Sequence, residues 1–254
     1  MNGTVKSATR VLEVFEYFDR IRRAATVMEV ARSLGYPQSS TSVLLRSLVD
    51  LGYLEQDSGR RTYLPTPRVT LLGSWIEPLL SPGGAIVRMM DELGELTGET
   101  IILGVPSGEA VRYIHVVQAT GAMRLHVGNG TMRPMAISGM GRLFMSTMDD
   151  VRVRQIVHRY NTEITREENK LNLAAVRRDL ASLRADGYAP SFDRVTPGAG
   201  GISVLLPVTP HGVPMAMAIG GLSKTINDNR DRLLLLIRKS IRRQLSDSSE
   251  LKAA

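Results

Sequence analysis

The chain has 254 residues, of which 43% are hydrophobic and 22% charged, so it can form one large or two ordinary domains and is not intrinsically disordered. It has no cysteine, which excludes disulfide bridges, thiolate metal sites and a cysteine nucleophile, and no apolar run approaches the roughly 18 residues of a membrane span. The net charge of +7 favours a polyanionic partner, but only +3 falls within residues 1–68, and a merely basic surface explains it equally well. With no signal-peptide pattern at the N-terminus, we expect a cytoplasmic protein.

Three helices are predicted in the first fifty residues. The first begins near Ser7, and its apolar side consists of Val11, Leu12, Val14, Phe15 and Phe18. The second, Thr26–Leu34, opens with a capping box, because the Thr26 hydroxyl can accept the amide of Glu29 while the Glu29 side chain reaches back to the cap. Gly35 ends this helix.

The third helix, Gln38–Leu51, has an apolar side of leucines at positions 44, 45, 48 and 51. Its polar residues are candidates for contact with a nucleic acid: Gln38, Ser39, Ser40, Thr41, Ser42 and Arg46. Glutamine pairs with adenine, arginine pairs with guanine, and hydroxyls contact phosphates or bases. Helix capping and a solvated face would explain the same residues if this helix stood alone.

A hairpin follows, with strands at Tyr53–Gln56 and Arg60–Leu64 around a turn at Asp57–Gly59. Helix, tight turn, helix and basic hairpin is the order of a winged helix-turn-helix, whose second helix enters the major groove of DNA. We therefore expect Arg60 and Arg61 to contact phosphate or the minor groove, although an exposed charged hairpin tip needs no DNA. Thr26, at a helix N-terminus, is a further candidate for phosphate contact.

The domain boundaries are predicted from segments with proline and glycine, which interrupt helices and strands. Residues 1–68 form the predicted winged helix-turn-helix, and 69–84 contain a connecting helix at Val69–Ile76 and a hinge at Ser81–Gly84. Residues 85–254 form the second predicted domain.

The second domain mixes short strands and helices. Strands are expected at Thr100–Val105, Ala110–Gln118, Met123–Val127, Tyr188–Phe192, Gly201–Pro207 and Pro214–Ile219. Helices are expected at Ala85–Thr97, Gly139–Met148, Asp150–Tyr160, Glu167–Asp186 and Thr225–Leu245. Hairpins in place of regular β-helix-β alternation predict an antiparallel α+β fold that can cup a small ligand. We interpret Pro197–Gly201 as a loop and not as a phosphate cradle, since no Lys-Ser/Thr follows it.

Five segments, 5–12, 34–41, 48–54, 133–142 and 185–189, resemble the isocitrate lyase regulator (IclR) family of bacterial transcription factors, and the likeness covers nearly the whole chain. The resemblance implies a winged helix, a linker helix that helps dimerisation, and a C-terminal GAF-like domain that binds a small metabolite. It implies dimers, or dimers of dimers, that bind inverted-repeat DNA near promoters and are not enzymes. No cofactor is implied.

The resemblance also implies a position for the metabolite. Gly139 and Met140, at the start of a helix, match family positions that line the ligand, and backbone amides there can hold a carboxylate. Weaker candidates by the same comparison are Leu125, Met135, Asp193 and Ser203, for which core packing or turn chemistry is at least as good an explanation. The family often has a glutamate and then a cysteine in this region. This chain has Arg194 near the place of the acid and lacks the cysteine, so the family's ligands are not transferable, and Arg194 itself is expected to be exposed.

Catalytic patterns are weak. The four histidines are scattered without metal-ligand spacing, although His115 and His126 lie on neighbouring predicted strands, and there is no Gly-x-Ser-x-Gly elbow. We interpret the chain as a ligand-responsive DNA-binding regulator, most simply a repressor, that responds to an acidic or aromatic metabolite. The alternatives are a small-molecule enzyme or a partner-binding sensor that uses the winged helix as an interaction module.

Overall fold

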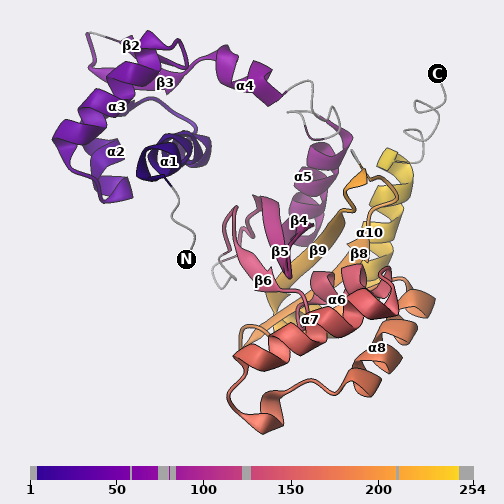
Figure 1. Ribbon diagram of the computed structural model, residues 1–254. Coiled ribbons are helices and arrows are strands. Elements are labelled where there is room, and N and C mark those ends of the chain that lie inside the picture. The colour runs from indigo at the N-terminus through magenta and orange to yellow at the C-terminus, as the bar shows by residue number, and fades with distance from the viewer. Residues whose placement is uncertain are drawn as a thin grey trace. The chain divides into compact units, whose positions relative to one another are not determined.

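The computed structural model describes residues 5–57, 59–73, 80, 84–121, 127–209 and 212–245. Contacts divide the chain into two compact units, Met1–Ser81 and Pro82–Ala254, which are described separately (Figure 1). The finer division at 1–68, 69–84 and 85–254 remains a prediction. Among the described residues, none of the helices combines the length and apolarity that a membrane crossing requires.

The first unit is a winged helix-turn-helix. Its elements are α1 (Lys6–Ile21), β1 (Ala25–Thr26), α2 (Val27–Leu34), α3 (Gln38–Asp50), β2 (Leu54–Asp57), β3 (Thr62–Pro65) and α4 (Pro67–Gly73). The strands form an antiparallel sheet in the order β1-β3-β2. The wing hairpin was predicted, but β1 was not, because its two residues show no strand pattern and are held only by pairing with β3, 36 or more positions away. The expected connecting helix begins earlier, at Pro67, and positions 74–76 lie outside the described residues.

The core of this unit lies where the three helices meet the small sheet. Its fully or nearly fully buried members include Val14, Tyr17, Phe18, Val30, Leu45, Leu48, Leu54 and Tyr63. Two expected core positions are wrong, because Leu12 is 63% exposed and Leu51 is 59% exposed. The buried stripe of α1 includes Tyr17 in place of Leu12, and Leu51 is the C-cap of α3, beyond its last turn.

The capping box of α2 is present as predicted. The Thr26 hydroxyl accepts the Glu29 amide at 3.3 Å, and the Glu29 carboxylate accepts the Thr26 amide at 2.8 Å. That backbone hydrogen bond, followed by those from Arg23 and the Thr26 hydroxyl, lowers the pKa of Glu29 to about 2. Gly35 ends the helix with a φ of 69°, a left-handed conformation that favours glycine.

The lowered pKa of Glu29 predicts an acid-dependent loss of stability. Because the carboxylate is stabilised in the folded state, its contribution is present above its ordinary pKa of 4.5 and is lost as pH falls towards 2. We expect Glu29→Gln to lower the free energy of unfolding at pH 7 and to flatten its decline between pH 4.5 and 2. Urea denaturation across that range measures both. Glu55→Gln is the control, since Glu55 is exposed and makes no ion pair among the described residues; equal pH profiles for the two variants would contradict the prediction.

The second unit is built around one antiparallel sheet. Its strands are β4 (Thr100–Ser107), β5 (Ala110–Val117), β6 (Met132–Pro134), β7 (Ala189–Phe192), β8 (Ala199–Leu205) and β9 (Ala216–Leu222). Their spatial order is β6-β5-β4-β9-β8-β7. The helices are α5 (Ala85–Thr97), α6 (Gly139–Ser146), α7 (Asp150–Glu163), α8 (Leu173–Asp186), α9 (Ser223–Asp228) and α10 (Arg230–Leu245).

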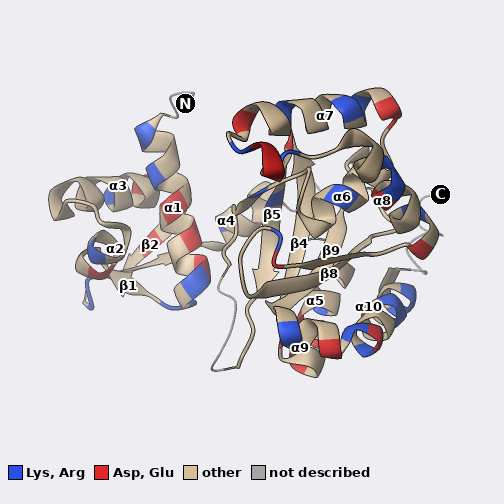
Figure 2. Cartoon of the chain, turned by 90° about the horizontal axis from the view of Figure 1, so that it is seen from below, with Lys and Arg blue, Asp and Glu red and all other residues tan. Residues whose placement is uncertain are grey.

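The sheet lies between two layers of helices, with α5, α9 and α10 on one face and α6, α7 and α8 on the other (Figures 1 and 2). Charged residues lie mainly on the helices, and Arg112 and Arg133 are the only two in the six described strands (Figure 2). Both faces of the sheet are thus apolar enough to be covered, and the predicted antiparallel α+β fold is confirmed.

Several predicted elements have different bounds. The expected helix at 167–186 is a short 3-10 turn at Glu167–Asn169 followed by α8, which Asn172 caps by accepting the Ala175 amide. The helix expected from Thr225 is divided into α9 and α10 at Asn229. Most of the strand expected at Met123–Val127 lies outside the described residues, and the edge strand β6 was not predicted.

Candidate functional site

The exposed face of α3 is the first candidate site. Gln38, Ser39 and Arg46 are exposed, and Ser42 is half-buried. A helix turns by about 100° per residue, so Ser39 and Arg46 point away from the buried Leu45 and Leu48. Arg46 makes no ion pair among the described residues; its Nε donates to the Ser42 carbonyl at 3.3 Å. The guanidinium is therefore available to an acceptor outside the chain.

Two predicted contact residues have structural roles instead. Thr41 is 1% exposed, and its hydroxyl donates to the Pro37 carbonyl at 3.0 Å, so its side chain lies in the core and we withdraw it as a contact. The Thr26 hydroxyl donates to the Glu29 carboxylate at 2.9 Å. A phosphate at this helix N-terminus would meet that negative charge, so we withdraw Thr26 as well. Ser40, whose hydroxyl also donates to the Pro37 carbonyl, is partly exposed.

The turn between β2 and β3 holds the two predicted wing arginines. Arg60 and Arg61 are both exposed, and Arg61 has a positive φ of 53°. One carboxylate oxygen of Asp57 accepts the Gly59 and Arg60 amides at 2.9 and 3.1 Å and thereby shapes the turn. The Arg60 guanidinium lies 3.9 Å from the other oxygen of Asp57, a long and solvated pair that a phosphate could replace.

A cavity of about 80 Å³ in the second unit is the second candidate site. It lies where the start of α6 faces the sheet, and its polar lining consists of Tyr113, Arg133, Ser138, Ser191, Arg194, Thr196 and Ser203. Missing side chains on the sheet contribute to the open space, since Gly201 and Gly220 pair across β8 and β9 and both line the cavity. The expected loop at Pro197–Gly201 is therefore partly wrong, because Ala199–Gly201 belong to β8.

The first turn of α6 presents backbone amides at the cavity. The Ser138 hydroxyl caps this helix by accepting the Gly141 amide at 3.2 Å. Gly139 and Met140 lie in the turn whose N–H groups have no partner within the helix. A Cβ at Gly139 would lie 3.1 Å from both Ser191 Cβ and Ser203 Oγ, so only glycine allows this close approach to the sheet without displacement.

The charge in the cavity is positive. The described residues that line it include two arginines, Arg133 and Arg194, and neither an aspartate nor a glutamate. Burial, followed by the nearby Arg142 charge, lowers the pKa of Arg194, and Asp179 opposes this. Burial also raises the pKa of Tyr113, although the nearby Arg133 opposes this, so the phenol stays protonated at neutral pH. Ser203 is 3% exposed and its hydroxyl has no hydrogen-bond partner among the described residues. An anion would supply the missing acceptors.

Arg142 holds the wall of this cavity in place. Its side chain is 5% exposed, and Nε and Nη2 each donate to the Asp179 carboxylate at 2.7 Å. Nη1 donates to the Pro190 carbonyl at 3.1 Å. One guanidinium thus connects α6, α8 and β7, next to Ser191 in the lining.

The predicted ligand residues divide into three groups. Gly139, Met140 and Ser203 line the cavity. Met135 does not line it: it is fully buried among the side chains of α6, α7 and α8. Asp193 is exposed, with a positive φ of 55°, and its carboxylate accepts the Gly198 amide at 2.6 Å, which is turn chemistry. Leu125 lies outside the described residues.

Sequence reasoning did not select Tyr113, Arg133 and Ser191. Arg194 is exposed, as expected, and it also lines the cavity. Arg133 stands at the start of the segment 133–142 that carried the resemblance, a signal that could have identified it. Tyr113 and Ser191 gave no comparable signal, since their two hairpins meet at the cavity only because β4 pairs with the distant β9.

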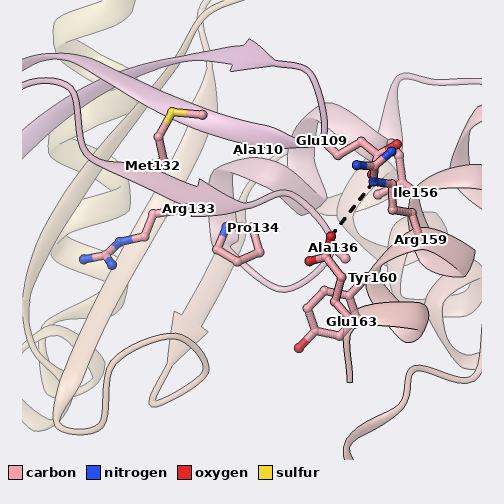
Figure 3. Close-up of a pocket in the computed structure, with 10 residues that line it drawn as sticks. All are labelled: Glu109, Ala110, Met132, Arg133, Pro134, Ala136, Ile156, Arg159, Tyr160 and Glu163. Carbon is pink, nitrogen blue, oxygen red and sulfur yellow. Dashed lines mark ion pairs between the residues drawn. The ribbon is translucent and has the colours of Figure 1, made fainter. Parts of the chain in front are cut away.

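A larger cavity, of about 370 Å³, lies between the edge of the sheet and α7 (Figure 3). The Nε of Arg159 lies 3.2 Å from Glu109 and 4.0 Å from Glu163, while the Arg133 guanidinium points away from this cluster (Figure 3). Its acidic and basic groups largely neutralise one another. We therefore place the candidate ligand in the smaller cavity, where the cations have no acidic neighbour in the lining.

Among the described residues, no three His, Cys, Asp or Glu side chains lie together as a possible metal site, so these residues give no support for metal chemistry. Of the two histidines that neighbouring strands were expected to bring together, His115 lies on β5 and His126 lies outside the described residues.

Comparisons with known proteins cover both units. The model of the IclR helix-turn-helix domain matches residues 7–58, and that of the bacterial transcriptional regulator IclR C-terminal domain matches residues 85–246. The acetate operon repressor of Salmonella typhimurium is 27% identical over 195 residues, which cover 76% of this chain and 70% of the relative. The transcriptional repressor IclR of Escherichia coli is 26% identical over 193 residues, which cover 75% and 70%.

Solved structures agree with this match. The effector domain of an IclR transcriptional regulator from Acinetobacter sp. ADP1 has a TM-score of 0.59 and 29% identity, over 63% of this chain and 93% of that chain. The IclR transcriptional regulator from Alicyclobacillus acidocaldarius has a TM-score of 0.61 over 96% of this chain and 99% of that chain; at 20% identity it shows the fold alone.

Proposed function

The chain belongs to the IclR family of bacterial transcriptional regulators, and on that premise we propose that it is a repressor whose DNA binding is modulated by a small anionic metabolite. The proposal of DNA binding rests on the exposed face of α3, from which Ser39 and Arg46 project. The capped helix α2 and a wing with two arginines support this helix. The proposed DNA contacts are Gln38, Ser39, Ser40, Ser42, Arg46, Arg60 and Arg61.

We propose a cytoplasmic homodimer, which can pair further, bound to an inverted repeat. Two copies of α3 would then occupy successive major grooves, about 10 base pairs apart or a multiple of that distance. Because the family consists of transcriptional regulators, no enzymatic activity is proposed. The repressor assignment is supported by the curated names of the relatives in Salmonella and E. coli.

Footprinting of the full-length protein on a DNA fragment that it selects tests this arrangement. Two protected half-sites, related by inverted symmetry and spaced by whole helical turns, are the expected result. A single protected half-site, with the protein monomeric at that concentration, would contradict the dimer.

The metabolite is proposed to occupy the cavity at the start of α6. A volume of about 80 Å³ suits a molecule of a few non-hydrogen atoms. The α6 amides, two guanidiniums and the unpartnered Ser203 hydroxyl together favour a small carboxylate. By linkage, a carboxylate that weakens DNA binding must itself bind the DNA-bound protein more weakly.

Arg194→Met tests the charge of this cavity. Losing one charge-assisted contact costs about 1.5–3 kcal/mol, so we expect a roughly ten- to hundredfold loss of carboxylate affinity. DNA binding without ligand should be unchanged. The measurement is calorimetric titration with the small mono- or dicarboxylate that most raises the melting temperature of the wild type.

Arg178→Met is the matched control, because Arg178 is an exposed arginine of the same unit without an ion pair among the described residues. Equal carboxylate affinity in the two variants would remove Arg194 from the site.

A further inference from the structure

Val43 is an apolar residue in the middle of the exposed face of α3. Its side chain is 58% exposed, and the buried residues of this helix are Thr41, Leu45 and Leu48. At about 100° per residue, Val43 points away from that core, about 40° around the helix from Ser39 and about 60° from Arg46, and it lies between them along the helix axis. It therefore lies on the exposed side of α3 that carries the proposed DNA contacts, next to a groove that it lines together with Arg10, Tyr36 and Leu44.

Nothing in helix formation explains a valine at this position. A β-branched residue loses side-chain freedom in a helix, and Val43, which is 58% exposed beside its groove, gains only partial burial within the unit in return. The flanking exposed positions hold the polar Ser39 and Arg46. An exposed apolar side chain beside polar ones is suited to a partner surface that is mostly polar but carries one apolar group.

The major groove of DNA is such a surface. Its base edges present hydrogen-bond donors and acceptors, and the C5-methyl group of thymine is its one apolar group. The side chain of valine is short, so its methyl groups reach a base only where the helix backbone lies deep in the groove, as it does along the part of a recognition helix whose side chains contact base edges.

We propose that Val43 contacts the C5-methyl of a thymine and selects that base in each half-site of the operator. This inference rests on the proposed function, since it requires α3 to enter the major groove. Arg46, one turn further along the same face, would contact a base nearby, so the two residues would specify neighbouring positions.

The experiment compares operator DNA in which thymines are replaced one at a time by deoxyuridine, which lacks only the C5-methyl. For the full-length wild type we expect one position per half-site at which this replacement weakens binding about fourfold, as burial of one methyl group implies. Val43→Ala removes the contact from both subunits of the dimer, so it should bind the thymine operator about fourfold more weakly for each half-site, or about sixteenfold in all, and show no further loss with deoxyuridine at that position.

Leu51→Ala is the control variant, because Leu51 is as exposed as Val43, at 59%, but lies at the end of α3. It should keep the full deoxyuridine effect. The proposal is wrong if the wild type binds its operator but no deoxyuridine position matters, or if Val43→Ala retains the whole effect. It is also wrong if Val43→Ala changes the oligomeric state, since the valine would then belong to a protein contact. Failure of the proposed function is a different result, in which the wild type selects no operator.

Discussion

Arg46→Ala is expected to weaken operator binding by about ten- to hundredfold for each half-site. A bidentate arginine–guanine pair contributes about 1–3 kcal/mol of discrimination, and a dimer would lose two of them. The structure supports this size of effect, because Arg46 is exposed on α3 and has no acidic partner among the described residues. Fluorescence anisotropy with labelled operator, at one fixed salt concentration, measures the change.

Two variants separate base recognition from general phosphate attraction. Arg46→Lys keeps the charge but loses the two-pronged geometry, so it should lose most of the same affinity. Arg242→Ala removes an equal charge from the exposed surface of α10 and should bind nearly as the wild type does. Unchanged affinity in Arg46→Ala, with the helix content preserved, would remove Arg46 from the contacts.

Asp179→Ala is expected to lower the stability of the second unit by about 3 kcal/mol, because removing one partner leaves the other as an uncompensated buried charge. Arg142 is that charge, at 5% side-chain exposure; the 35% exposure of Asp179 places the expected value at the low end of the range for buried pairs. Urea denaturation followed by far-ultraviolet circular dichroism resolves the transition of this unit.

Asp150→Ala is the matched control. Asp150 also accepts hydrogen bonds from arginines, Arg154 on its own helix and Arg177 on α8, but all three side chains are solvent-exposed. Solvent screening should make its loss far less costly. If the two variants were equally stable, the Arg142 guanidinium would not depend on Asp179 for its compensation.

Local patterns predicted the parts of the fold that depend on neighbouring residues. The capping box of Thr26 and Glu29, the stop at Gly35 and the hairpin of β4 and β5 need only a few adjacent positions, and all of them are present. The strands β1 and β6 could not be predicted, since two or three residues carry no periodic signal and their pairing partners supply the hydrogen bonds.

The candidate sites divide in the same way. The polar face of α3 follows from helical periodicity, and so does the burial of Thr41, which lies four and seven residues before the buried Leu45 and Leu48 but was grouped with the contacts because its side chain is polar. In the second unit, the start of α6 was found from one segment, whereas Tyr113 and Arg194 reach the cavity from other parts of the chain. Which residues meet across a sheet depends on its register, and a single sequence does not contain that information.

Selection of genomic DNA fragments with the purified full-length protein, repeated at two salt concentrations, tests the central claim most directly. A sequence-specific regulator should recover one inverted-repeat motif at both concentrations, with affinity that falls as salt rises because lysine and arginine release counterions from the phosphates. Binding that is equally salt-sensitive but enriches no motif would contradict the claim, since a basic surface would then account for all of the attraction to DNA.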